Sequence, residues 1–284
     1  MTLDLAGFGH ARTVSVAGTS VRAVASEPHA WNSEVVVTVN VHNQAGPLAI
    51  CLESITRQEP PAGGLSVVVF DDNSSDDWAV TTGRFLKRIP LIVCRARCGS
   101  PSRARNAALS FVDEAMQNTR WVARLDADDC FSTPRSLFAA CALGDHRDAR
   151  WVLGGNRLVQ EGRLLERENP ATEALLRPAH VLSVLRSMAQ GTADNELPSC
   201  NLLLRPRAGW RYPEVESAED HWLVTDLLLN HAPSGAVLTA PLYCDYNLGG
   251  EVTAANRRSE RYLTSRQALF AQAQVWAARP GSGR

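Results

Sequence analysis

Acidic side chains gather where two apolar segments of the sequence end. Asp71 and Asp72 follow one such segment, and Asp126-Ala-Asp128-Asp129 follows another. Side chains two positions apart in an extended segment point the same way, so Asp126 and Asp128 are expected to face one side together. Carboxylates that converge in this way repel one another unless a cation or the donors of a ligand compensate them. Two carboxylates, completed by phosphate oxygens, suit a divalent cation such as Mg²⁺ or Mn²⁺.

Each acidic group also has a purely structural interpretation. A Ser-Thr-Pro segment comes shortly after Asp129, and aspartate is common where helices begin. Asp71 and Asp72 fit a turn in which a carboxylate caps backbone N–H groups. Further along, Ser217-Ala-Glu-Asp220 is close to a capping box, in which the fourth residue bonds back to the first.

The elements that must position these residues alternate between strand and helix. Nearly every residue from Val35 to Val41 is apolar and β-branched, which is typical of a strand buried on both faces. Helices are predicted to begin at Pro47, at Ser75 as N-cap candidate, and at Ser100-Pro101. The predicted strands of this half span residues 35–41, 65–70, 91–94 and 121–125. Four alternations predict an α/β fold with a parallel sheet, whose ligands bind beyond the carboxyl ends of the strands.

The rest of the sequence is less regular. Residues 13–24 alternate around a Gly-Thr-Ser turn, which predicts a hairpin within an N-terminal extension. Residues 243–258 contain Gly249-Gly250 and are a candidate mobile lid. Between them the pattern predicts strands over 151–159 (interrupted at Gly154-Gly155) and 199–205, and helices over 178–190, 217–231 and 257–278.

Composition excludes several classes of protein. The chain has 284 residues, 45% of them hydrophobic, and a formal net charge of −1, so neither disorder nor a duplex nucleic acid partner is expected. No apolar run reaches the roughly 18 residues of a membrane span, and Met1 to Gly7 lacks the basic cluster of a secretory signal. Seven cysteines occur without Cys-x-x-Cys or zinc-type spacing. We therefore expect reduced cysteines and a cytoplasmic protein.

Four segments stand in order along the chain and together span about residues 35 to 230, most of its length. They are residues 35–43, residues 67–76, residues 102–108 leading into 121–129, and Glu219-Asp220 with Trp222 just after. Taken together they resemble the inverting glycosyltransferases of family 2, which have the GT-A fold. Asn40-Val-His42 departs from the Pro-Thr-Tyr that the family usually has at the end of the first strand, so His42 is either a stacking partner for a base or a polar loop residue.

The resemblance implies how a nucleotide-sugar would be bound. Asp72, with Asp71 as second choice, resembles the aspartate that contacts the base. Asn43 resembles a residue of the nucleotide site, and Arg105 resembles the arginine near the nucleotide and its diphosphate. Asp126 resembles the first aspartate of the Asp-x-Asp pair, directed at the ribose or at the metal.

The resemblance also implies the chemistry. Asp126 and Asp128 resemble the residues that hold Mn²⁺ or Mg²⁺, and Asp220 resembles the general base that accepts the proton of the acceptor. We expect its position in the first turn of a helix to lower its pKa. Residues expected to line the acceptor site are Glu219, Trp210 and Trp222, with Tyr212 as a further exposed aromatic candidate.

The expected function is metal-dependent, inverting transfer of a sugar from a UDP-sugar to a hydroxyl or amine of a carbohydrate or small-molecule acceptor. Alternatives are a non-catalytic nucleotide-sugar or glycan-binding module and a nucleotidyltransferase, although the loop 40–47 lacks the basic residues of the latter. No oligomeric state is indicated. The expected organisation is an extension (1–33), a nucleotide-sugar-binding half (34–130), an acceptor-binding and catalytic half (131–256) and a C-terminal helix and tail (257–284).

Overall fold

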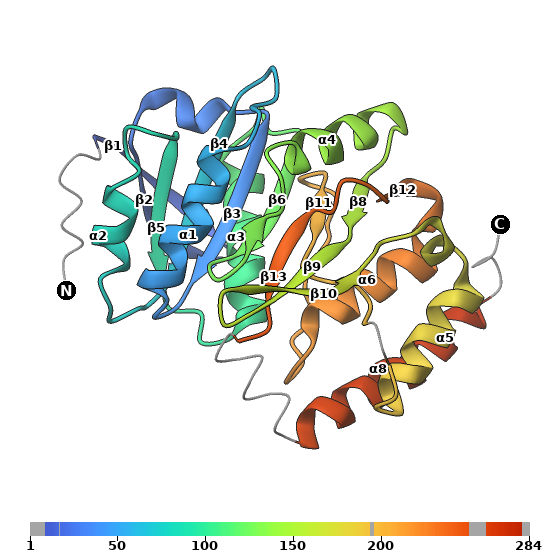
Figure 1. Cartoon of the computed structure of the whole chain (residues 1–284). Coiled ribbons are helices and arrows are strands. Elements are labelled where there is room, and N and C mark those ends of the chain that lie inside the picture. Colours follow the sequence, from blue (N-terminus) through green and yellow to red (C-terminus); the bar gives the residue numbers. More distant parts are fainter. Residues whose placement is uncertain (1–8, 17, 194–195, 250–259, 280–284) are drawn as a thin grey trace.

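A nine-stranded sheet in the order β1-β2-β5-β4-β3-β6-β11-β8-β12 forms the centre of the molecule (Figure 1). The structure, a computed structural model, describes residues 9–16, 18–193, 196–249 and 260–279. The strands are β1 (His10–Val16), β2 (Thr19–Ala25), β3 (Val35–Val41), β4 (Leu65–Asp72), β5 (Leu91–Ala96), β6 (Trp121–Asp126), β8 (Trp151–Gly154), β11 (Leu202–Leu204) and β12 (Gly235–Leu238).

The middle of this sheet is parallel. Strands β5, β4, β3 and β6 run side by side in the same direction, and their apolar side chains are buried on both faces. The β1–β2 hairpin extends the sheet antiparallel to β5, and β11 pairs antiparallel with both β6 and β8. The predicted α/β fold with a mostly parallel central sheet is therefore confirmed.

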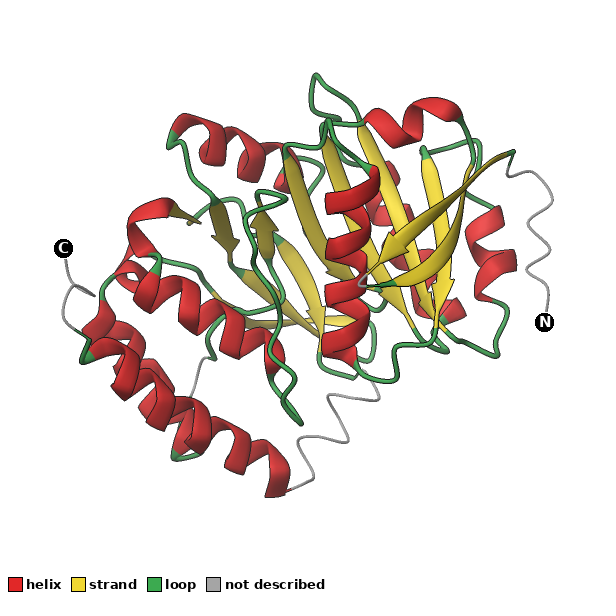
Figure 2. Ribbon diagram, turned by 180° about the vertical axis from the view of Figure 1, so that it is seen from behind, coloured by secondary structure: helices red, strands yellow, loops and turns green. Residues whose placement is uncertain are grey.

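Helices cover both faces of the sheet. One face carries α1 (Ala45–Thr56), α2 (Trp78–Gly83) and α4 (Ser136–His146), and the other carries α3 (Pro101–Ala115) and α6 (Glu219–Asn230) (Figure 2). Ser100 caps α3 by accepting the N–H of Arg103, as its position before Pro101 predicts. Outside α6 lie α5 (Pro178–Ala189) and α8 (Glu260–Ala277), and short 3₁₀ turns are η1 (Pro28–Asn32), η2 (Glu173–Leu176) and η3 (Ala232–Ser234).

A second, four-stranded sheet lies beside the carboxyl end of the first and has the order β10-β9-β13-β7. Its strands are β7 (Cys130–Phe131), β9 (Asn156–Gln160), β10 (Arg163–Asn169) and β13 (Cys244–Asn247). The strand predicted over 151–159 is interrupted at Gly154-Gly155 as expected, and its two parts, β8 and β9, belong to different sheets because the chain changes sheets at Gly155. A Cβ on Gly155 would lie 2.7 Å from the backbone N of Ala171, so only glycine fits this crossing.

Other expectations need correction. The helix predicted from Ser75 begins later, with Asp77 as the residue before α2. The candidate lid over 243–258 begins as strand β13, and its residues 250–258 lie outside the described part of the chain. The first three residues of the predicted helix 257–278 also lie outside it. No helix in the described ranges is long and apolar enough to cross a membrane.

Candidate active site

The two acidic loops lie together at the carboxyl edge of the parallel strands. Asn40 on β3 is level with Asp126 on β6, and the next residue, Val41, is level with Asp71 on β4. The same edge receives the first turn of α6, where Asp220 stands. Residues from both halves of the chain therefore meet where the strand pattern predicts a ligand site.

Asp126 is held by two arginines. Arg124 stands two residues earlier on β6, so its side chain points to the same face and contacts the Asp126 carboxylate. Arg105 reaches the same carboxylate from α3, with its Nη2 atom 3.2 Å from Oδ2. Burial alone would raise the pKa of Asp126, but the two guanidinium groups outweigh it and hold that pKa below its ordinary value. Asp126 is therefore ionised and already paired with positive charge.

These arginines also contact the first turn of α6. Arg105 forms an ion pair with Glu219, and Nη1 of Arg124 lies 4.0 Å from the Asp220 carboxylate. Ala218 takes the N-cap position with a left-handed φ of 63°, and the Oγ of Ser217 is buried without a hydrogen-bond partner. The capping-box interpretation of this segment is therefore wrong, and its acidic side chains face the arginines instead.

Asp220 accepts hydrogen bonds on both carboxylate oxygens. The Ser199 hydroxyl donates to Oδ2 at 2.9 Å, and the backbone N–H of His221 donates to Oδ1 at 2.8 Å. Burial would raise the pKa of Asp220, but the His221 ring, Arg124 and Arg105 together hold the pKa well below its usual range. The expected lowering of the pKa is found, with neighbouring cations and hydrogen bonds as its causes. The Asp220 carboxylate is thus ionised at neutral pH and can accept a proton.

Asp128 has a different environment from Asp126. Burial, together with the nearby Asp126 charge, raises the pKa of Asp128 to about 6. A carboxylate whose charge is opposed in this way is stabilised by a cation. Since Mg²⁺ and Mn²⁺ sites commonly use one or two carboxylates with phosphate oxygens, Asp128 fits such an ion, whereas Asp126 already pairs with two arginines.

The two aspartates after β4 differ in exposure. Asp71 is fully buried, accepts the N–H of Ser74 at 2.9 Å and pairs with Arg95 at 3.0 Å, so it holds the turn from inside. Burial raises the pKa of Asp71. Asp72 is partly exposed at the rim, where its carboxylate accepts the backbone N–H groups of Cys98 and Gly99. Of the two, only Asp72 can present a carboxylate oxygen to a ligand.

Asn43 joins the loops that follow β3 and β4. It has a left-handed φ of 53°, its N–H donates to the Ser74 hydroxyl at 2.9 Å, and its Oδ1 accepts the N–H of Ser75 at 2.8 Å. The Nδ1 atom of the His42 ring lies 2.7 Å from the backbone carbonyl oxygen of Asp72. These contacts fix the rim on which Asp72 stands.

Both tryptophans that were predicted to line the acceptor site pack against other residues. Trp210 packs edge-on against His231 with ring centres 4.6 Å apart and lies under Arg150, which precedes β8 at the opposite edge of the sheet. Trp222 packs against Trp276 of α8, with ring centres 6.0 Å apart. The ring contacts of both tryptophans are thus with residues outside the Asp126 and Asp220 cluster.

Sequence reasoning missed several neighbours of the site. Tyr212, expected to be exposed, is only 2% exposed, and its ring centre lies 5.6 Å from the guanidinium carbon of Arg105 and 5.9 Å from that of Arg124. Arg124 itself was a detectable signal, since it is the lone charge within an apolar strand and stands two residues before Asp126. Ser199 lies in the segment 198–201, which the sequence places beside the Glu219-Asp220 helix, and its hydroxyl contacts Asp220 as that expectation requires.

Comparison with known proteins supports the resemblance to family 2 glycosyltransferases. Residues 35–149 match the family described as glycosyl transferase family 2. This region, which makes up less than half of the chain, is similar to that family. The search of curated proteins gave no match.

Solved structures resemble this chain over most of its length. Staphylococcus aureus TarS 1–349 in complex with UDP-GlcNAc matches with a TM-score of 0.64 and 22% identity, covering 87% of this chain and 68% of that one. The mannosyltransferase PcManGT from Pyrobaculum calidifontis, in complex with GDP-Man and Mn²⁺, matches with a TM-score of 0.51 and 18% identity, covering 87% and 73%. In a further S. aureus TarS structure the match covers 43% of that chain. These similarities establish the GT-A fold.

Proposed function

We propose that this glycosyltransferase moves a sugar, with inversion, from a UDP-sugar to a hydroxyl or amine of a carbohydrate or small-molecule acceptor. One observation carries the proposal. Asp126, in the nucleotide-binding half, and Asp220, in the acceptor half, meet around the guanidinium of Arg124. A donor-binding carboxylate and a candidate base are therefore held at one edge of the sheet, which is the arrangement that a single displacement requires.

The donor would lie along the edge formed by β4, β3 and β6. Asp72 and Asn43 stand at the rim, where Asp72 presents a partly exposed carboxylate to the N–H of a base. Asp126, fixed by Arg105, faces the ribose. The similarity to TarS bound to UDP-GlcNAc and to UDP supports uridine as the base, and PcManGT bound to GDP-Man shows that the fold also serves guanosine donors.

Asp128 would hold the divalent cation together with the diphosphate of the donor. When bound, Mn²⁺ or Mg²⁺ neutralises the charge that develops on the leaving nucleoside diphosphate. Arg105 supplies a fixed positive charge at the same edge, because its side chain is only 12% exposed and is held by Asp126 and Glu219. The buried guanidinium therefore adds to the stabilisation of the leaving group.

Asp220 would accept the proton of the acceptor. Its low pKa keeps it ionised, and it gains basic strength only if the contacts from Ser199 and His221 loosen as the acceptor binds. Proton transfer would then occur late, as the acceptor oxygen or nitrogen acidifies during attack on the anomeric carbon. Attack from the face opposite the diphosphate breaks the glycosyl–phosphate bond and inverts the configuration.

The test combines donor binding with product stereochemistry. We expect UDP-sugars to raise the melting temperature in the presence of Mn²⁺, and the stabilising donor to release UDP slowly in water. NMR of the first sugar released should show the anomer opposite to that of the donor. Binding without UDP release from any UDP-sugar would instead support a non-catalytic module. Release of pyrophosphate from a nucleoside triphosphate would support a nucleotidyltransferase.

A further inference from the structure

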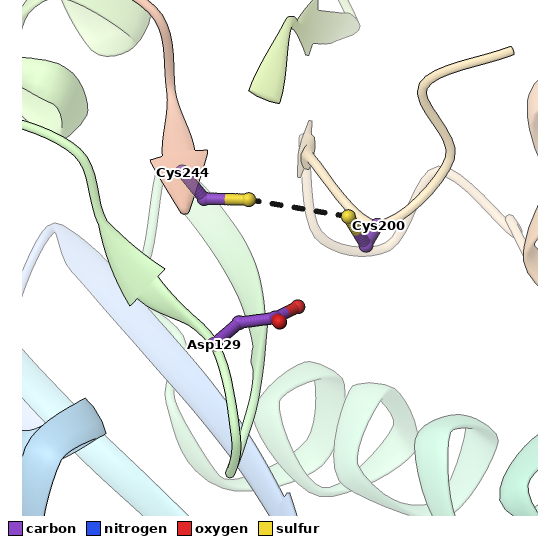
Figure 3. Close-up of side chains that lie close together, drawn as sticks. All are labelled: Asp129, Cys200 and Cys244. Carbon is purple, nitrogen blue, oxygen red and sulfur yellow. Dashed lines mark hydrogen bonds between the residues drawn. The ribbon is translucent and has the colours of Figure 1, made fainter. Parts of the chain in front are cut away.

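Two cysteines and an aspartate converge in a buried cluster next to the donor site. Asp129, Cys200 and Cys244 come from the turn after β6, the segment before β11 and the first residue of β13 (Figure 3). Their ligand atoms all lie within 4.8 Å of one another, and all three residues are at most 4% exposed. None of these residues has a role in the transfer reaction proposed above.

The spacing of the two sulfurs matches a shared metal ion. The Sγ atoms of Cys200 and Cys244 are 3.9 Å apart. Two thiolates on a tetrahedral Zn²⁺ with Zn–S bonds of about 2.3 Å lie about 3.8 Å apart. A disulfide would bring the sulfurs to about 2.05 Å.

Asp129 has a buried carboxylate oxygen without a hydrogen-bond partner. Its Oδ1 accepts the backbone N–H of Asn247 at 2.9 Å, whereas its Oδ2 is buried and has no hydrogen-bond partner. Burial of an unpartnered carboxylate oxygen is costly unless a cation compensates it. The side chain extends toward the side on which both sulfurs lie (Figure 3). Asp129 therefore has the free oxygen that a metal ion would use.

A fourth donor is oriented toward the same point. The amide nitrogen of Asn201 donates to the Gly154 carbonyl and to Oδ1 of Asn156, both at 3.2 Å. These bonds turn Oδ1 of Asn201 toward the sulfurs, and it accepts hydrogen bonds from the thiols of Cys200 at 2.9 Å and Cys244 at 2.6 Å. Hydrogen bonds of this kind fix the orientation of a ligand before the metal arrives.

We propose that Cys200, Cys244 and Asp129 bind one Zn²⁺ ion, with the side-chain oxygen of Asn201 as the fourth ligand. Binding forms two Zn–S bonds and releases the two thiol protons to solvent. Thiolates select Zn²⁺ over Mg²⁺ and Mn²⁺, which prefer oxygen, so this ion is chemically distinct from the donor cation at Asp128. Four protein ligands and deep burial make the site structural.

The site would clamp the two halves of the active centre. Asp129 follows directly on Asp128, Cys200 follows directly on Ser199, and Ser199 donates its hydroxyl to Asp220. An ion shared by Asp129 and Cys200 therefore fixes the cation-binding turn relative to the hydroxyl that orients the candidate base. These ligands act as positioning residues.

Cobalt titration of the reduced, metal-stripped chain tests the site without any donor or acceptor. We expect one equivalent of Co²⁺ to produce a thiolate-to-cobalt charge-transfer band, and Zn²⁺ to abolish it. Cys200→Ser and Cys244→Ser should weaken Co²⁺ binding and reduce the band. Cys94→Ser, which changes an equally buried cysteine on β5, should retain both. Asp129→Asn, which keeps an oxygen for the Asn247 N–H, should keep the band, because both thiolates remain, and should weaken Zn²⁺ binding measurably.

Two results would overturn the proposal. One is a reduced chain that gives no charge-transfer band with Co²⁺, and the other is a band that survives in both Cys200→Ser and Cys244→Ser. Circular dichroism on each variant separates loss of metal binding from loss of folding. Because the titration contains no nucleotide-sugar, its outcome is independent of whether the proposed transfer reaction is correct.

Discussion

Asp126 and Asp220 approach the guanidinium of Arg124 from opposite halves of the chain. Arg124 contacts the Asp126 carboxylate directly and lies 4.0 Å from that of Asp220. The arginine side chain is only 4% exposed, so water screens these charges little. One buried cation on β6 therefore holds together the carboxylate proposed to bind the donor and the one proposed to activate the acceptor.

Removal of this cation should destabilise the fold. Arg124→Met leaves Asp126 and Asp220 without their shared partner, and breaking a buried pair in this way costs about 3–5 kcal/mol of unfolding free energy. Arg120→Met serves as the control, since the side chain of Arg120 is 49% exposed. Exposed ion pairs contribute about 0–1 kcal/mol. Urea denaturation of both variants measures the difference, and equal midpoints would contradict the central role of Arg124.

Asp220→Asn should separate catalysis from donor binding. The amide keeps the shape of the side chain and loses the ability to accept a proton, so the rate of UDP release should fall about 100-fold or more. UDP affinity, measured by calorimetry with Mn²⁺, should stay near the wild-type value. Asp226→Asn changes another aspartate of α6 and should leave turnover unchanged. Near-normal turnover in Asp220→Asn would rule out the proposed role.

The sequence predicted the strands that carry the site better than the contacts within it. Strand β3 has the predicted bounds, because a run of β-branched apolar residues has one favourable burial pattern. The meeting of Cys200 with Cys244 was not predictable, since Cys200 precedes β11 of the first sheet and Cys244 begins β13 of the second. The spacing of residues in the sequence predicts which side chains are neighbours along one strand or helix, whereas a cluster such as this depends on tertiary packing.

At Gly155 the chain passes from the first sheet to the second, and the close packing there predicts the effect of a substitution on stability. A Cβ there would meet the backbone N of Ala171 at 2.7 Å and the carbonyl oxygen of Asn169 at 2.9 Å. Backbone atoms cannot move aside as side chains do, so Gly155→Ala should cost about 1–3 kcal/mol. Gly46→Ala, in α1 with no atom within 4 Å of the new Cβ, should be neutral or stabilising by up to about 1 kcal/mol.

Thermal or urea unfolding of both glycine variants provides the measurement. Because Gly155 joins β8 to β9, its variant should also loosen the second sheet, which contains Cys244. Similar stability of Gly155→Ala and Gly46→Ala would show that the crossing between the sheets accommodates a side chain.

Asp128 should couple stability to pH in a direction opposite to that of a salt-bridged aspartate. Its pKa of about 6 in the folded chain lies above the ordinary value of 3.8, so the folded state binds the proton more tightly. This contribution is fully present below pH 3.8 and is lost as pH rises through 6. In metal-free protein at pH 7.5, ionisation of Asp128 therefore lowers the free energy of unfolding by up to about 3 kcal/mol.

Asp128→Asn removes that cost together with the cation ligand. In the presence of EDTA the variant should be more stable than the wild type at pH 7.5, and the gap should close at pH 4 because Asp128 is then protonated. Mn²⁺-dependent donor binding should fall steeply in the wild type below pH 6 and should be lost in the variant at every pH. Asp148→Asn, at an exposed position, should show neither effect. A stability gap that does not change with pH would mean that burial and the charge of Asp126 do not raise the pKa of Asp128.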